Sequence, residues 1–119
     1  MKQKVHSVSY LAKAEFKFKD GVYDLVALPC GSEVVKVSLE VVGNPTTGSV
    51  SVGFKDETQK NYFLVLENVN KDKNATSAKD YTATSNKVVV AEVKAVNGND
   101  AKGVLRVLYF LPSVIEVEY

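Results

Sequence analysis

The chain has 119 residues, with 15 basic and 14 acidic side chains, a formal net charge of +1, one cysteine and one histidine. This length fits a single domain, and the near-neutral charge excludes the strongly basic field with which proteins attract nucleic acid or an anionic membrane in bulk. One cysteine excludes an intramolecular disulfide, and together with one histidine it cannot supply the usual ligand set of a zinc site.

The sequence has no targeting or membrane-spanning pattern. No apolar run of signal-peptide length follows the N-terminal lysines, and the longest apolar stretch, residues 104–111, is too short to cross a bilayer. We therefore expect synthesis in a cytoplasm without secretion, and neither a membrane nor a nucleic acid as a partner.

The N-terminal residues 1–12 are polar with scattered apolar positions and predict an arm with no partner strand nearby. The folded domain is then expected to span residues 13–119. After the arm, period-two alternation dominates, which is typical of β-strands. Asp20-Gly21 is a strong turn signal that predicts a hairpin between the preceding alternating residues and a returning strand at residues 22–28.

The clearest half-buried strand is expected at residues 33–42, after a turn at residues 28–31 that contains Pro29 and Gly31. Alternation divides this strand into an apolar face and a polar face. The predicted inward side chains are Val35, Val37, Leu39 and Val41, and the outward ones are Lys36, Ser38 and Glu40.

The rest of the chain alternates between polar segments and valine-rich segments. The polar composition predicts three exposed loops, which are typical contact surfaces, at residues 43–48, 55–61 and 70–80, the last with at most one helical turn. Further strands are expected at residues 49–54, 62–69, 86–96, 103–111 and 113–119, with a turn at 97–100 and a break at Pro112. Strands at this spacing predict one all-β domain, a β-sandwich of about eight strands with jelly-roll topology.

Side chains suited to catalysis or metal binding are few. His6 is the single imidazole and lies near a terminus, and Cys30 lies in a Pro-Cys-Gly turn without a neighbouring cation or second cysteine to activate its thiol. Asp56 and Glu57 lack the array of acidic and amide residues of a calcium loop. We expect no catalytic, cofactor-binding or metal site and no enzyme activity, with a carboxylate enzyme built on Asp56 and Glu57 as the minor alternative.

Tyrosines keep a sugar-binding surface open as a second alternative. Tryptophan is absent, and packing in a core or an interface explains Tyr62, Tyr81, Tyr109 and Tyr119 more simply than a sugar platform.

The two ends of the chain admit two interpretations. Residues 113–119 follow the proline break, so this strand could add to the sheet of another chain. Alternatively, residues 1–12 and 113–119 both pair within the same sandwich.

Several landmarks follow one another in an order that resembles small virion proteins of tailed bacteriophages. They are the Leu-Pro-x-Gly segment at residues 28–31 with the alternating valines after it, a short strand ending in glycine at 48–53, residues 60–64, and a turn at 97–102 followed by the glycine-to-tyrosine strand at 103–109. The resemblance covers residues 28–109, about two-thirds of the chain. The sequence departs from the pattern at Cys30, where the family favours a small residue, and in its extension beyond Tyr109.

The resemblance to capsid decoration (cement) proteins implies a function. Such proteins bind the outside of the phage head, often as homotrimers, and hold neighbouring major capsid subunits together. It therefore implies that the partners are the major capsid protein and further copies of this chain, in a virion. We expect the arm and the polar loops to contact the capsid and exposed valine or tyrosine faces to form the trimer. A tail or head-fibre component that binds a host receptor or glycan is the alternative.

Overall fold

Two long bent strands organise the molecule, β4 (Glu33–Phe54) and β8 (Lys87–Phe110). The computed structural model describes residues 1–112 and 114–118, and in this part of the chain the fold is all-β, without a helix. The remaining strands are β1 (Lys2–His6), β2 (Ser9–Lys17), β3 (Gly21–Leu28), β5 (Leu64–Leu66), β6 (Asn74–Ser77), β7 (Tyr81–Thr82) and β9 (Val114–Glu118).

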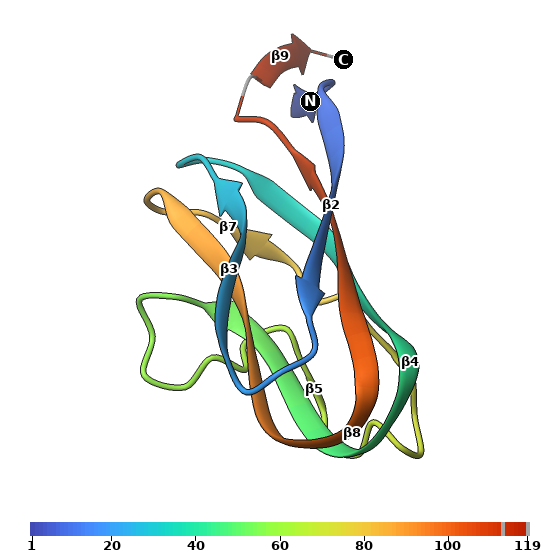
Figure 1. The fold of residues 1–119 in the computed structure, drawn as a ribbon. Coiled ribbons are helices and arrows are strands. Elements are labelled where there is room, and N and C mark those ends of the chain that lie inside the picture. Colours follow the sequence, from blue (N-terminus) through green and yellow to red (C-terminus); the bar gives the residue numbers. More distant parts are fainter. Residues whose placement is uncertain (113, 119) are drawn as a thin grey trace.

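The two long strands pair along their whole length and turn back together, so that one seven-stranded antiparallel sheet forms two facing layers (Figure 1). In one layer, the first half of β4 pairs with the second half of β8, with β2 and the short β6 and β7 beside them. In the other layer, the second half of β4 pairs with the first half of β8, flanked by β3 and β5. The predicted jelly-roll-like β-sandwich is confirmed.

The core lies between the two layers and is built by alternation. On β4, Val37, Leu39, Val50 and Val52 point inward and are at most 1% exposed. Opposite strands supply matching apolar side chains, and burial of such groups contributes about 25 cal/mol per Å². The largest fully buried side chains are Phe54, Leu28, Leu39, Leu105, Val34, Val37, Val50, Val52, Val69, Val89, Val90 and Val93.

One predicted inward position is wrong. Val35 is only half-buried, and Val34 is 1% exposed instead. The pairing of β4 with β8 shifts register between Val34 and Lys36, so an irregularity interrupts the alternation at this point.

The predicted hairpin around Asp20-Gly21 is also wrong, although the chain does turn there. β2 pairs with the second half of β8 and β3 with the first half, so this turn crosses from one layer to the other. The short connection between β2 and β3 favoured direct pairing of these two strands. Each of them instead pairs with a different half of the longer, bent β8.

Two of the expected loops or turns are parts of the bent strands. Residues 43–48 continue β4 and residues 97–100 continue β8, with several register shifts at the bend. Gly43 and Gly98 have φ values of +115° and +114°, which side chains other than glycine rarely adopt. A third predicted loop, residues 70–80, contains β6, and it is preceded by a turn in which the amides of Lys71 and Asp72 donate to the carbonyl oxygen of Asn68.

The predicted absence of a partner strand for the N-terminal arm is wrong. β1 pairs with β9 of the same chain, over residues 2–6 and 114–118, but in a separate two-stranded sheet and not within the sandwich as the alternative interpretation had it. Residues 113 and 119 of the expected last strand lie outside the described residues. β2 begins at Ser9, so residues 9–12 belong to the main sheet. The domain boundary expected between residues 12 and 13 stays a prediction.

Candidate interaction surfaces

The pair β1–β9 forms a ribbon that extends from one end of the sandwich (Figure 1). Lys4 lies opposite Glu116, and Val5 lies opposite Ile115. Because side chains alternate along a strand, Lys2, Lys4 and Glu116 share one face of the ribbon, and Gln3, Val5 and Ile115 share the other. One face is therefore charged and the other mainly apolar.

The outer edges of this ribbon are open. In the described part of the chain, β1 and β9 have only each other as sheet neighbours. The ion pair from Lys2 Nζ to Glu116 Oε1, 3.9 Å, joins two well-exposed side chains on the charged face. Each strand thus presents a row of backbone groups that another strand could bind.

The ribbon is anchored at its base by three contacts. The Nδ1 atom of His6 donates to the carbonyl oxygen of Leu111 at 2.9 Å, and the Leu111 amide donates to the carbonyl oxygen of Val8 at 2.8 Å. Pro112 packs against Gly31, in the turn before β4. His6, the single imidazole of the sequence, therefore joins the ribbon to the sandwich.

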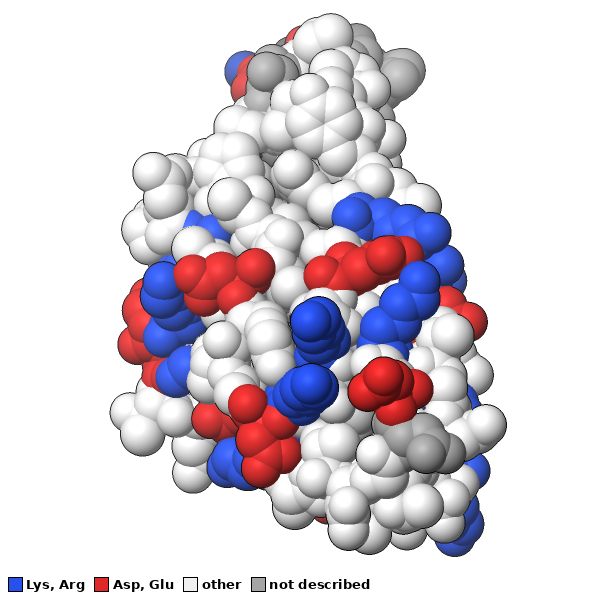
Figure 2. Space-filling model, viewed as in Figure 1, with Lys and Arg blue, Asp and Glu red and all other residues white. Residues whose placement is uncertain are grey.

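Exposed apolar side chains gather at this end of the molecule. Leu11 is 62% exposed, Ile115 59% and Tyr10 51%, and Met1, Val5 and Val8 are also exposed. On the face seen in Figure 2, charged side chains gather over the middle of the molecule, and few of them are visible among the described residues above it. A concentration of apolar surface of this kind is typical of an interaction site. We call this end, from Met1 to Leu11 with Ile115, the apolar tip.

A second surface is the outer face of the layer formed by β2, β8 and β4. The strand register places its charges in bands, with Lys13 beside Arg106, then Glu15 and Glu40 on either side of Val104, then Lys17 beside Lys102. Like charges directly opposite one another destabilise a sheet. The charged side chains relieve this by pairing across the bands.

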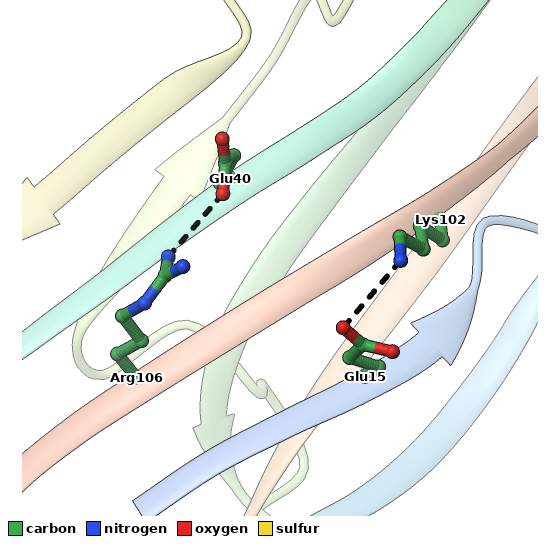
Figure 3. Close-up of polar contacts among 4 residues, drawn as sticks. All are labelled: Glu15, Glu40, Lys102 and Arg106. Atoms are coloured by element: carbon green, nitrogen blue, oxygen red, sulfur yellow. Dashed lines mark hydrogen bonds and ion pairs between the residues drawn. The ribbon is translucent and has the colours of Figure 1, made fainter. Parts of the chain in front are cut away.

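Figure 3 shows the two diagonal pairs on this charge-banded face. Arg106 Nη1 lies 3.3 Å from Glu40 Oε1, and Lys102 Nζ lies 3.5 Å from Glu15 Oε1. All four side chains are partly exposed, so each pair contributes less than about 1 kcal/mol. The face is polar and internally compensated, and sequence analysis overlooked it although the alternating charges of β2 were its signal.

The residues considered for chemistry lie apart. Cys30 is exposed, and its amide donates to Asn86 Oδ1 at 2.9 Å. Asp56 Oδ2 accepts from Lys87 Nζ at 2.6 Å, and this hydrogen bond lowers the pKa of the Asp56 carboxyl and raises the pKa of Lys87. Among the described residues, no group of three or more histidine, cysteine or acidic side chains could hold a metal ion.

The tyrosines considered for sugar binding pack mostly inward. Tyr62 and Tyr81 are half-buried, and their ring centroids lie 5.4 Å apart. The ring centroid of Phe54 lies 5.3 Å from that of Tyr62 and 4.6 Å from that of Tyr81. Tyr109 is 8% exposed and packs edge-on against Tyr10. Tyr119 lies outside the described residues.

The polar segments meet in part at the bend of the long strands. Thr46, Thr47 and Gly48 of β4 line one shallow hollow together with Asn68 and Asn70. In Figure 1 this bend lies at the opposite end of the sandwich from the ribbon. In residues 1–112 and 114–118, no helix is long and apolar enough to span a membrane.

Comparison with solved structures gives a match over the full length of the chain. A chain of the acidic stable capsid structure of Helicobacter pylori bacteriophage KHP30 is 78% identical, with a TM-score of 0.94 and 100% of both chains covered. A chain of the cyanophage Pam1 capsid asymmetric unit has the same fold, with 20% identity, a TM-score of 0.69, and 87% of this chain and 85% of that chain covered. A chain of the Ralstonia phage GP4 capsid also has this fold, with 14% identity, a TM-score of 0.63, and 92% of this chain and 88% of that chain covered. No family model and no curated protein matches the chain.

Proposed function

Because the chain belongs to the same family as the KHP30 capsid chain, and is therefore a capsid-associated structural protein, we propose that it is a decoration (cement) protein of a bacteriophage head. In this role it binds the outside of the head, as a homotrimer, and stabilises contacts between neighbouring major capsid subunits. It is synthesised in the host cytoplasm and reaches the virion without secretion.

The observation that carries this proposal is the 78% identity over the whole chain to a protein found in a capsid. The resemblance of residues 28–109 to decoration proteins, which rests on the order of landmarks, supports the finer assignment. So does the shape of the molecule, a strand-rich sandwich 56 Å long and 18 to 23 Å across with open strand edges at one end. Such a molecule suits the bridging of several subunits better than the enclosure of a ligand.

The capsid-binding surface is assigned to the polar end of the sandwich. The bend of β4 and β8 exposes Thr46, Thr47 and the neighbouring Asn70. Polar contacts of this kind are individually weak. Many copies repeated over a symmetric shell, each attached as a trimer, would give strong attachment through avidity.

The test is binding of the purified protein to expanded capsids assembled without it. We expect saturable co-sedimentation, density for the protein on the outer surface by cryo-electron microscopy, and a higher temperature of capsid disruption. A chain that is found within the shell wall, and without which no shell assembles, would contradict the decoration role. Binding to host-surface glycans on an array without capsid binding would favour the receptor-binding alternative.

A further inference from the structure

The β1–β9 ribbon is the element whose edges and faces specify a partner. A lone two-stranded sheet is at best marginally stable in water, and this one exposes both edges and an apolar face that carries Val5 and Ile115. A ribbon of this composition gains stability when further strands cover its edges and its apolar face.

Charge indicates which strand can cover each edge. The β1 edge carries Lys2 and Lys4, and the β9 edge carries Glu116. Two copies that joined β1 to β1, or β9 to β9, would bring like charges together across the new pair, which is destabilising. Joining β9 of one copy to β1 of the next brings glutamate beside lysine. The ribbon is therefore complementary to a second copy in a head-to-tail arrangement only.

Strand direction is consistent with this arrangement. β1 and β9 run antiparallel within the chain. Rotation about an axis along the ribbon keeps each strand's direction, so β9 of one copy and β1 of the next are again antiparallel. Head-to-tail contacts close into a ring when the rotation between successive copies closes, and otherwise give an open filament.

The number of copies is that of the proposed trimer, and the interior of the ring excludes a ring of two. Two copies would give a closed sheet of four strands, which is too narrow to enclose side chains, because barrel diameter grows with strand number. Three copies give six strands, around an interior that would be lined by Val5 and Ile115 together with Gln3 of each copy. Lys2, Lys4 and Glu116 would then lie on the outer surface, in water.

We infer that three copies of this chain join through their ribbons in a head-to-tail ring, with β9 of each copy paired to β1 of the next, as a six-stranded barrel at the apolar tip. The inference deepens the trimer of the proposed function and rests on it. It assigns the joint to the ribbon, leaving the polar end of each sandwich free for the capsid.

Cysteine cross-linking tests the joint directly. In a Cys30→Ser background, Lys4→Cys and Glu116→Cys proteins each carry a single cysteine, so a disulfide within one chain is impossible. The two proteins are oxidised separately and after being unfolded and refolded together, and Lys2→Cys replaces Lys4→Cys in a second series to allow for register. Lys13→Cys, on the charge-banded face, mixed with Glu116→Cys is the matched control.

The head-to-tail ring predicts cross-linked dimers in the mixture alone, amounting to roughly half of the chains when copies assort at random. Neither single protein should cross-link, and neither should the control. Cross-linking of Glu116→Cys or Lys4→Cys by itself would replace the ring with a two-fold contact and overturn the inference.

Light scattering on the same samples separates the inference from the proposed function. A trimer without cross-links in either mixture would show that copies join elsewhere, which overturns the ribbon joint and leaves the decoration role intact. If the protein is a monomer in solution, the mixtures are oxidised on capsids, where the same pattern is expected. A protein that neither binds capsids nor self-associates would refute both.

Discussion

Pro112 packs against Gly31 so closely that a Cβ atom on Gly31 would lie 2.7 Å from the Cβ atom of Pro112. Gly31 has a φ of +90°, and its amide donates to the carbonyl oxygen of Ala83 at 2.7 Å. The turn before β4 therefore fixes the segment that joins β8 to the ribbon. The Leu-Pro-x-Gly landmark of the sequence has a direct role in positioning the ribbon.

Gly31→Ala is expected to destabilise the protein by about 1–3 kcal/mol, because the added methyl group meets Pro112 and the φ is unfavourable for alanine. The measurement is chemical unfolding, with light scattering to follow assembly. Gly21→Ala is the matched control, because its φ is also positive, at +148°, but its added Cβ atom would make only an ordinary contact, 3.7 Å from Tyr23. An equal effect of the two substitutions would argue that Pro112 contributes nothing.

A second close approach lies within the sheet. Phe16 and Gly103 are direct partners across β2 and β8, and the Phe16 ring lies over the glycine, where it would overlap any Cβ atom. Gly103→Ala should cost about 1–3 kcal/mol by forcing the ring from its site. Phe16→Ala, which empties the same site, should cost about 3–5 kcal/mol.

A double-mutant cycle measures this contact. In Phe16→Ala the site over residue 103 is free, so adding Gly103→Ala should then cost much less than it does in the native chain. Strictly additive losses in unfolding free energy would show that the ring and the glycine are energetically independent.

The hydrogen bond between Asp56 and Lys87 predicts a dependence of stability on pH. It lowers the pKa of the Asp56 carboxyl below its usual 3.8, so its contribution is present above that value and is lost as the pH falls through the folded-state pKa. It raises the pKa of Lys87 above its usual 10.5, so that contribution is present below 10.5 and is lost as the pH rises through the folded-state pKa.

The pair therefore stabilises the fold between about pH 4 and pH 10, weakly, because water screens it. Unfolding of Lys87→Met and the native chain at pH 3 and pH 7 should show a difference at pH 7 that shrinks at pH 3. Lys13→Met removes the same charge from the charge-banded face and serves as the control. A Lys87→Met effect that is unchanged at pH 3 would contradict this assignment.

Alternation was sufficient to predict the fold class, because inward and outward side chains differ sharply where one face is buried. It correctly placed Val37, Leu39 and Val41 inside. Alternation could not reveal that residues 43–48 continue β4, since Gly43, Pro45 and Gly48 have the composition of a loop. Here the bent strand uses the positive φ of the glycines to turn, and only pairing with β8 makes the segment a strand.

The pairing of β1 with β9 was not predicted from the sequence, for a different reason. Lys2 pairs with Glu118 across almost the whole chain, and a short polar strand carries little hydrophobic signal of its own. The complementary alternation of lysines near one end and glutamates near the other was the available clue. It becomes decisive only when the two ends are known to lie side by side.

Truncation separates the role of β1 from that of the sandwich. Deleting residues 1–7 removes β1 and leaves β2 complete from Ser9, so the sandwich should keep its melting temperature within a few degrees while losing self-association. Deleting residues 1–12 also removes the residues that pair with Phe110 to Val107, including Tyr10 against Tyr109, and should destabilise the sandwich itself. Circular dichroism melting and light scattering on both variants give the two readouts.

If the shorter deletion leaves a trimer intact, β1 does not form the contact between copies. If the shorter deletion yields a folded monomer that still binds capsids, more weakly because it has lost avidity, then the ribbon serves assembly between copies and the sandwich alone contacts the shell.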